Sequence, residues 1–208
     1  MPEQGLRERK KQATRRRIAD VATALFAARG FDNVTVAEVA EAANVSKMTV
    51  FNYFPRKEDL FLDRHADRIA ALEEVVRERP EGTSVVEAMR RHHHELLAAR
   101  HPLSGAIEGV VGFWQVLRSS PALVQRMHEQ GREIEDALAA VLAEEDPDAT
   151  RTRVVAGLLT AVIGSVFGIA VSRILDGDDV EEVRRDQVGV LDRAFDLLEH
   201  GVGGYGRR

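Results

Sequence analysis

The chain has 208 residues, of which 44% are apolar and 30% charged, so it can bury a core and is not of the disordered class. It has no cysteine, which excludes a disulfide framework and thiolate chemistry and is compatible with the cytoplasm. The first eleven residues lack an apolar segment, so no secretory signal is expected. Aromatic residues make up only 5% of the chain, which favours helices over sheets.

The net charge of −5 is unevenly distributed. Residues 1–65 contain 12 Lys and Arg against 9 Asp and Glu, a balance of +3. The remaining 143 residues contain 17 against 25, a balance of −8. A basic N-terminal part on an acidic body suits a small domain that faces a polyanion, although a basic segment can also serve solubility alone.

The N-terminal segment divides into a polar start and a predicted helix. Residues 1–12 have no apolar pattern, so we expect them to be mobile and to reach phosphate or the minor groove through four cations, Arg7, Arg9, Lys10 and Lys11. Apolar residues at i, i+3, i+4, i+7 and i+8 from Ile18 predict a helix over 13–29 that stops at Gly30. Its turn around Arg15 is expected to pass close to a nucleic acid.

Two short helices around a tight turn are predicted between Thr35 and Phe54. Thr35 and Glu38 have the spacing of a capping box, in which each side chain satisfies a free amide at the start of a helix. Asn44 tolerates the left-handed conformation that a tight turn needs. Ser46 is placed to cap the helix that follows.

The second helix of this pair, residues 47–53, has two different sides at about 100° per residue. Val50 and Phe54 lie on the inward side, and Met48 and Asn52 lie nearly opposite. An Asn side chain can pair with adenine, Thr49 can meet several base groups, and an apolar side chain can meet a thymine methyl. Two flanking residues are expected to hold phosphates, Lys47 and Tyr53.

By helix spacing alone, this segment could equally be an αα-hairpin inside a helical bundle. Its residues decide the matter, because the sequence VSKMTVFNYFPRKEDLF resembles the helix-turn-helix of the TetR family of transcriptional regulators, over roughly residues 15–61. Asn44 and Met48 stand where that family usually has glycine, which leaves the operator sequence open.

The resemblance implies an all-α protein of about nine helices. It implies a DNA-binding domain over 1–55, a ligand-binding and dimerisation domain over 56–201 and a flexible tail over 202–208. It also implies a repressor that binds a palindromic operator as a dimer and is released by a small molecule, with no cofactor. The expected DNA-binding set is Arg15, Thr35, Ser46, Lys47, Met48, Thr49, Asn52, Tyr53 and Lys57, where Lys57 is assigned to a phosphate by the resemblance alone.

Six more helices are predicted after Phe54. Pro55 is expected to open a long helix over 56–78 that joins the two domains. Capping signals predict four others, over 84–100, 121–145, 147–176 and 179–200, opened by Ser84, Ser120, Asp146 and Asp178. Apolar residues predict one more, over 103–117.

An uncharged run of 18 residues, 154–171, permits two interpretations. It is barely long enough to span a membrane, and it contains a Gly-x-x-x-Gly packing motif. A helix that is apolar all round is also typical of a buried interface. We favour the interface and expect no membrane, because the resemblance implies dimerisation through the last two helices.

The three consecutive histidines His92–His94 could suggest a metal. Neighbouring helical residues point about 100° apart, so one helix cannot direct all three at one ion. We therefore expect no metal and expect His93 alone to point inward, as a core or pocket residue.

The ligand site is predicted from the bulky residues of the body. The candidate lining is Met89, His93, Phe113, Trp114, Leu117 and Phe167, which would suit an apolar or aromatic molecule, and plain core packing explains these residues equally well. No nucleophile, phosphate loop or tied carboxylate pair predicts an enzyme. A helical ligand-binding protein without DNA function is the main alternative, and an enzyme a weaker one.

Overall fold

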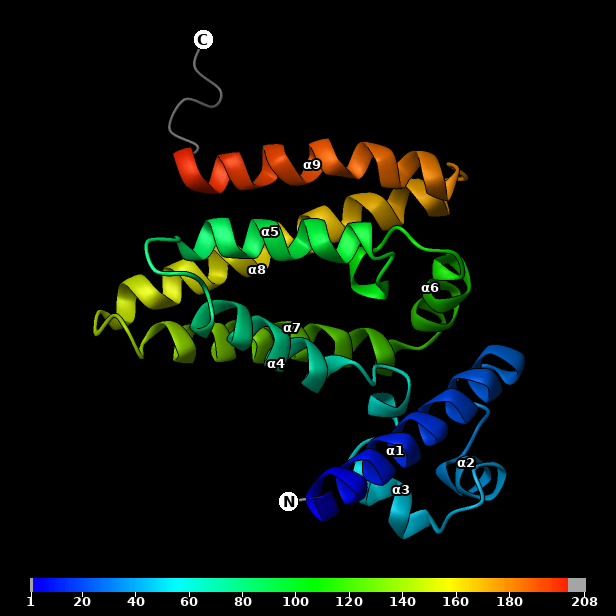
Figure 1. Cartoon of the computed structure of the whole chain (residues 1–208). Helices are drawn as coiled ribbons and strands as arrows, with labels where there is room; N and C mark the ends of the chain where they lie inside the picture. The colour runs from blue at the N-terminus through cyan, green and yellow to red at the C-terminus, as the bar shows by residue number, and fades with distance from the viewer. Residues whose placement is uncertain (1, 202–208) are drawn as a thin grey trace. The chain divides into compact units, whose positions relative to one another are not determined.

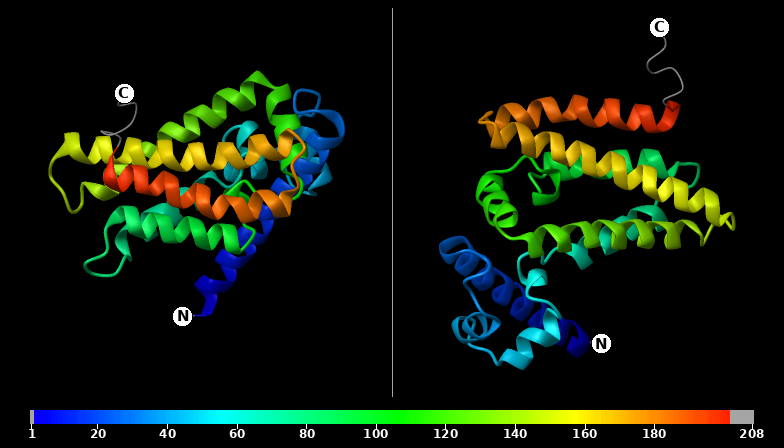
Figure 2. Two further views of the ribbon diagram at one scale, coloured as in Figure 1. Left: turned by 90° about the horizontal axis from the view of Figure 1, so that it is seen from above. Right: turned by 180° about the vertical axis from the view of Figure 1, so that it is seen from behind.

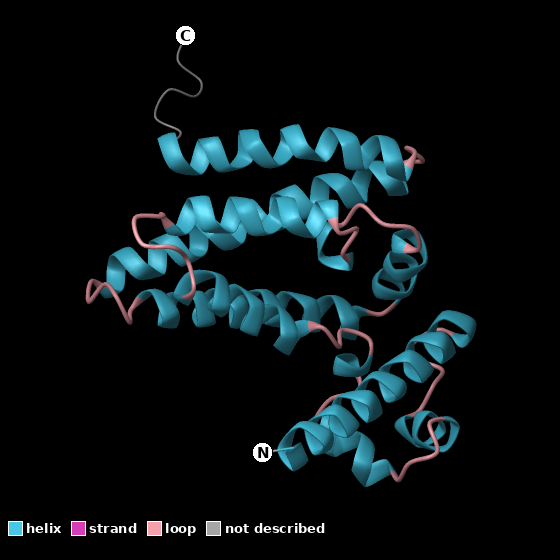
Figure 3. Ribbon diagram, in the orientation of Figure 1, coloured by secondary structure: helices cyan, strands magenta, loops and turns pink. Residues whose placement is uncertain are grey.

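The computed structural model describes residues 2–201 and shows only helices and loops over that range (Figure 3). The expected flexible tail, 202–208, lies outside the described residues. The prediction of an all-helical chain is confirmed. Within the described range the chain forms nine α-helices, joined by loops and two short 3₁₀ turns (Figure 1).

The chain divides into two compact units, each of which draws on two segments of the sequence. The first unit comprises the residues up to Ala66 together with Gly112–His128, and the second comprises Asp67–Val111 and the residues from Glu129 onward. Helices α6 (Val110–Ser119) and α7 (Pro121–Leu142) therefore contribute residues to both units.

The first unit contains α1 (Pro2–Arg29), α2 (Val36–Ala42), α3 (Lys47–Tyr53) and the 3₁₀ turn η1 (Glu58–Leu60). Its core is continuous from α1 to the start of α7. The buried apolar residues of this core include Ile18, Ala22, Phe26, Phe31, Val39, Val50, Phe54, Leu60, Phe61, Leu117 and Leu123.

The second unit contains α4 (His65–Arg77), α5 (Val85–Ala98), the 3₁₀ turn η2 (Pro102–Ser104), α8 (Ala149–Leu175) and α9 (Val180–His200). The views in Figures 1 and 2 show α9 lying alongside both α5 and α8. Arg90 of α5 pairs with Asp196 and Glu199 of α9, which ties the two helices together at one end.

The helix predicted over 13–29 starts earlier, because α1 begins at Pro2 and takes up most of the segment for which no regular structure is predicted. The segment is rich in Arg, Lys, Glu and Gln, which are good helix formers. Bonds between neighbouring turns support the helix: Arg9 Nε donates to the Gly5 carbonyl at 3.1 Å, and Gln12 Nε2 donates to Glu8 Oε1 at 3.1 Å.

The long helix predicted over 56–78 is interrupted, and α4 begins only at His65. Leu60 and Phe61 are buried in the core of the first unit, and Arg15 donates to the Asp63 carbonyl. These tertiary contacts hold the chain in a 3₁₀ turn and a loop, where local sequence alone favours a helix.

The helix predicted over 103–117 also starts later, at Val110. Gly105 and Gly109 have φ values of 78° and 82°, in the left-handed region that interrupts a helix. A Cβ at Gly105 would lie 3.0 Å from the Phe167 carbonyl oxygen, so the close approach of this loop to α8 also requires glycine.

Helix boundaries elsewhere differ by a few residues. Helix α7 ends at Leu142, before the predicted residue 145. The side chains that cap α8 and α9 are Asp148 and Asp179, one or two residues beyond the predicted positions, since their carboxylates accept from the first free amides of each helix. Ser84 caps α5 as predicted, because its Oγ accepts from the Glu87 amide, which is one of the two bonds of the capping box predicted there.

Candidate nucleic-acid interface

Helix α2 begins with the predicted capping box. The Glu38 amide donates to Thr35 Oγ1 at 3.3 Å, and the Thr35 amide donates to Glu38 Oε2 at 2.8 Å. The bonds that the Glu38 carboxylate accepts from the Thr35 amide, the Thr35 hydroxyl and the nearby Arg29 guanidinium lower the pKa of Glu38 to about 2. The ionised carboxylate therefore fixes the start of the helix-turn-helix over the physiological pH range.

The turn between α2 and α3 has the predicted left-handed residue. Asn44 has a φ of 52°, and its amide donates to the Glu41 carbonyl at 3.0 Å. The Val45 amide donates to the Ala40 carbonyl at 2.9 Å, and its side chain packs, partly buried, against the core of the unit. This turn sets the direction in which α3 leaves α2.

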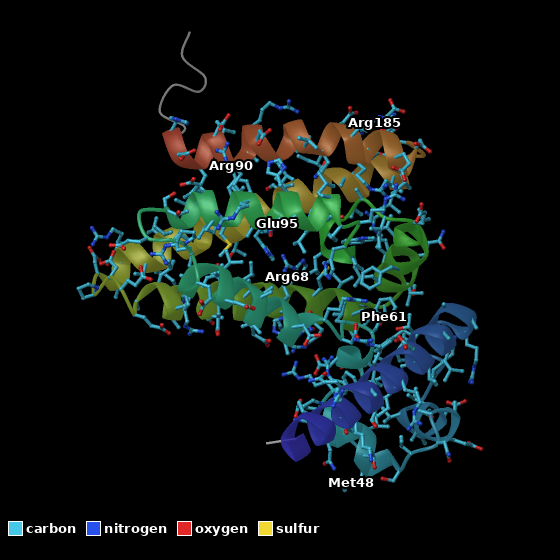
Figure 4. All side chains as sticks on the ribbon, viewed as in Figure 1. Met48, Phe61, Arg68, Arg90, Glu95 and Arg185 are labelled. Carbon is cyan, nitrogen blue, oxygen red and sulfur yellow. The ribbon has the colours of Figure 1, made fainter. Side chains whose placement is uncertain are left out.

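Helix α3 has the two faces that its sequence predicts. Val50 is fully buried and Phe54 is 2% exposed, whereas Met48 is 69% exposed. Asn52 is also exposed. In Figure 4, Met48 points outward from α3. An exposed face with an amide and a flexible thioether on a helix of this size can contact base edges in a major groove.

The polar residues at the start of α3 are linked to one another. Ser46 Oγ accepts from the Thr49 amide at 3.0 Å and lies 2.8 Å from Thr49 Oγ1. Lys47 is exposed and its Nζ lies 5.8 Å from the centre of the Phe51 ring, a long cation–π contact. Tyr53, at the other end of α3, packs partly buried against the core.

Two of the predicted DNA contacts, Lys57 and Arg15, have their charged groups engaged within the unit. Lys57 Nζ donates to the Phe31 carbonyl at 2.6 Å and lies 4.1 Å from the centre of the Phe31 ring. Arg15 donates to the Asp63 carbonyl and lies over the Phe54 ring.

Helix α1 carries a row of exposed cations. Arg9, Lys10, Lys11, Arg16 and Arg17 are all exposed, whereas the side chain of Arg7 lies outside the described residues. Such charges attract a polyanion without reading its sequence.

Sequence reasoning missed the part that α6 and α7 play in supporting this unit. Arg126 of α7, only 8% exposed, donates from Nε to Asp59 Oδ1 at 2.7 Å. The rings of Phe61 and Phe113 stack with their centres 4.6 Å apart. These residues are far apart in sequence, so no local spacing could have predicted their pairing.

The six residues proposed to line a ligand site are divided between the units. Phe113, Trp114 and Leu117 pack in or against the core of the first unit. Met89 is fully buried in α5, whereas His93 and Phe167 line a small cavity in the second unit. The cavity has a volume of about 10 Å³, which is roughly enough for one water molecule.

The three histidines of α5 diverge, as the helical wheel predicts. His93 is the buried member, and its Nδ1 lies 2.8 Å from the Met89 carbonyl oxygen. His94 Nε2 pairs with Asp192 at 2.9 Å. Among the described residues, the one cluster with ligands close enough for a metal is Asp196, Glu199 and His200, which lies on the surface and whose two carboxylates already pair with Arg90.

Comparisons with known proteins agree with this geometry. Residues 18–63 match the family of bacterial regulatory proteins called the tetR family. The chain is 29% identical to the transcriptional regulator TcmR of Streptomyces glaucescens, over 76% of this chain and 73% of TcmR. It is 28% identical to the transcriptional repressor AcnR of Corynebacterium diphtheriae, over 90% of both chains.

Solved structures show the same fold. NalD of Pseudomonas aeruginosa, the secondary repressor of a multidrug efflux pump, matches with a TM-score of 0.56 at 18% identity, over 89% of this chain and 96% of NalD. A TetR-family regulator of Mesorhizobium loti matches with a TM-score of 0.51 at 18% identity, over 89% of this chain and 96% of its own.

The first unit is therefore a helix-turn-helix DNA-binding unit attached to a helical body. Residues 18–63 belong to the tetR family of bacterial regulatory proteins, and the relatives that match most of the chain are transcriptional regulators as well. Its function is to regulate transcription by binding DNA, and it is not an enzyme. This sets aside both alternatives that the sequence left open.

Proposed function

We propose that this regulator is a dimeric repressor that binds a palindromic operator and is released by a small molecule. The observation that carries the proposal is the exposed face of α3, where Met48 and Asn52 point outward from a helix whose Val50 is fully buried. Two such helices would enter successive major grooves about 34–36 Å apart.

Within this interface, we assign base contacts to Met48, Thr49 and Asn52 and phosphate contacts to Lys47 and Tyr53. Thr35 and Ser46 hold the starts of α2 and α3, where the free amides can also face phosphate. Lys57 and Arg15 are engaged inside the unit, so we assign them to holding its frame.

We propose that the dimer forms through α8 and α9. Helix α8 is long and apolar enough to cross a membrane by composition, and only 33% of its most apolar window is buried. The exposed large apolar residues of the second unit lie mainly on these two helices, at Val154, Leu158, Ile169, Val188 and Leu197. A second copy that covers them explains the exposure without a membrane.

We propose that the effector is largely apolar or aromatic and binds in the second unit, next to His93 and Phe167. The walls of the cavity there are mostly apolar, with Leu97, Leu103, Ile163, Val166 and Leu191 completing them. Its small volume means that a ligand must widen it, which is how binding would favour a second conformation. We also propose that the boundary between the DNA-binding and ligand-binding domains lies at residues 55–56. We propose that the protein acts in the cytoplasm.

The first experiment is a fluorescence anisotropy titration against DNA that flanks the protein's own gene, at two salt concentrations and with nonspecific competitor. We expect nanomolar, competitor-resistant binding with two protomers for each palindromic site. Weak binding that ignores sequence and disappears at moderate salt would contradict the proposal.

Variants then test the placement of α3. Asn52→Ala should change the base preference at one operator position, and Lys47→Ala should weaken binding to all sequences and reduce the salt slope by about one. Arg132→Ala is the matched control, because Arg132 is an exposed cation on α7 in the second unit, outside the proposed dimer helices. Unaltered affinity and base preference in Asn52→Ala would show that the helix is placed wrongly.

A further inference from the structure

The small cavity of the second unit contains a hydrogen-bond acceptor without a donor. Gln187 of α9 is 1% exposed and lines the cavity. Its Nε2 donates to the Val166 carbonyl at 2.6 Å, whereas its Oε1 has no hydrogen-bond partner among the described residues. Exchanging the two amide atoms would bring two oxygens together, so the bond to Val166 fixes Oε1 as the unpaired atom.

The other polar residues of the cavity are uncharged. Burial lowers the pKa of His93 to about 4, so the ring is neutral at physiological pH. The contact with the Met89 carbonyl requires a proton on Nδ1, which leaves Nε2 as an acceptor. Ser104 contributes a hydroxyl, and the remaining lining residues are apolar.

A buried acceptor that lacks a donor is costly, and a ligand that supplies the donor recovers this cost. An anionic ligand would instead meet two lone-pair atoms and no cation among the residues that line the cavity. A lone water molecule can satisfy Gln187 in the unliganded protein, and a hydroxyl group can replace it at the same place.

We propose that this cavity is the polar end of the effector site and selects a neutral ligand whose hydroxyl or N–H group donates to Gln187 Oε1. The inference rests on the proposed effector site in the second unit. It narrows the ligand class from apolar or aromatic molecules in general to those that carry an uncharged donor, and it disfavours carboxylates.

One wall of the cavity is a short turn that α9 holds in place. The turn η2 contributes Leu103 and Ser104 to the lining, and it is followed by Gly105 and Ala106. Arg184 of α9 donates from Nε and Nη2 to the Ala106 carbonyl, at 3.2 and 3.1 Å. The wall is therefore held by a side chain three residues before Gln187 on the same helix.

The test compares phenol with toluene, which has a similar shape and lacks the donor, and with benzoate, which is anionic. Dissociation constants for the full-length protein are measured by NMR titration. We expect the preference for phenol over toluene to fall about ten-fold in Gln187→Met, because the loss of one buried hydrogen bond has roughly that effect. Comparing the ratio of the phenol and toluene dissociation constants between the wild type and Gln187→Met cancels the difference in hydrophobicity between the two probes.

Gln130→Met is the matched control, since Gln130 is a buried glutamine that does not line the cavity. It should keep the wild-type preference. If Gln187→Met does not fold, the side-chain carbonyl ¹³C signal of Gln187 in the wild type should shift with phenol and not with toluene. Three results would overturn the inference. The first is a preference for phenol over toluene that is the same in Gln187→Met as in the wild type. The others are tight binding of benzoate and no binding of any probe.

Operator binding by the unliganded protein separates this inference from the proposed function. If operator DNA is bound but Gln187→Met keeps the phenol preference, the ligand class is wrong and the regulator stands. If the wild type fails to bind the operator while the preference depends on Gln187, the repressor proposal is wrong and the ligand class stands.

Discussion

Lys57 Nζ lies 2.6 Å from the Phe31 carbonyl oxygen, so the lysine that the family resemblance assigns to a phosphate joins two segments of the DNA-binding unit. Burial lowers the pKa of this ammonium, and the nearby carboxylates of Asp32, Glu58 and Glu38 oppose the shift. The contact holds the loop after α1 against the segment after α3, and it thereby helps to orient the recognition helix.

Replacing Lys57 by Met should destabilise the protein by about 1–2 kcal/mol, because the Phe31 carbonyl loses a charged donor. Operator affinity should fall, and the salt dependence should stay the same. Chemical denaturation and anisotropy at several salt concentrations measure the two effects. Lys47→Met is the control, since this exposed lysine should leave stability unchanged and reduce the salt slope by about one. A Lys57→Met protein of normal stability with a reduced salt slope would assign Lys57 to a phosphate.

The buried His93 should make stability depend on pH. Its pKa is about 4 in the folded protein and about 6.5 when unfolded. The unfolded state therefore binds a proton first as the pH falls, so stability is full above about pH 6.5 and is lost progressively between about 6.5 and 4. The total loss from this group should be on the order of 3 kcal/mol. Denaturation curves measured at several pH values across this range give the free energy of unfolding as a function of pH. This free energy should change less with pH in His93→Gln than in the wild type, and an equal change would contradict the assignment.

Arg68 of α4 is a partly buried cation with no ion pair or hydrogen bond among the described residues, and burial lowers its pKa. Figure 4 labels it on the side of α4 that faces α5. Arg68→Met keeps the apolar stem and removes the unpaired charge, so it should stabilise the protein by about 1 kcal/mol. Thermal unfolding measures the change, with Arg132→Met, at an exposed position of α7, as a control expected within about 0.5 kcal/mol of wild type. Destabilisation by Arg68→Met would show that the guanidinium has a favourable partner.

The dimer proposal predicts the effect of a charge on α8. Leu158 is 50% exposed, and Leu158→Glu should shift the protein toward monomers and weaken operator binding, because a charge in a buried interface is costly. Val111→Glu is the control: Val111 is 37% exposed but lies on α6. Analytical ultracentrifugation distinguishes the two variants. A Leu158→Glu protein that dimerises as tightly as Val111→Glu would place the interface elsewhere.

Features set by neighbouring residues could be predicted from the sequence by itself. The Thr35 capping box, the left-handed Asn44 and the buried Val50 opposite the exposed Met48 depend on residues within one or two turns, and the structure has them as predicted. Spacings of three and four residues determine these features because backbone geometry fixes which side chains meet.

Tertiary packing decided the remaining features. Phe61 and Arg15 interrupt the helix predicted over 56–78, and Phe113 joins the core of the DNA-binding unit through its stack on Phe61. Gln187 lies beside His93 only because α9 packs along α5. Contacts between residues far apart in sequence leave no periodic signal, since they depend on how whole helices pack, and this is why the cavity and its unpaired acceptor emerged only from the structure.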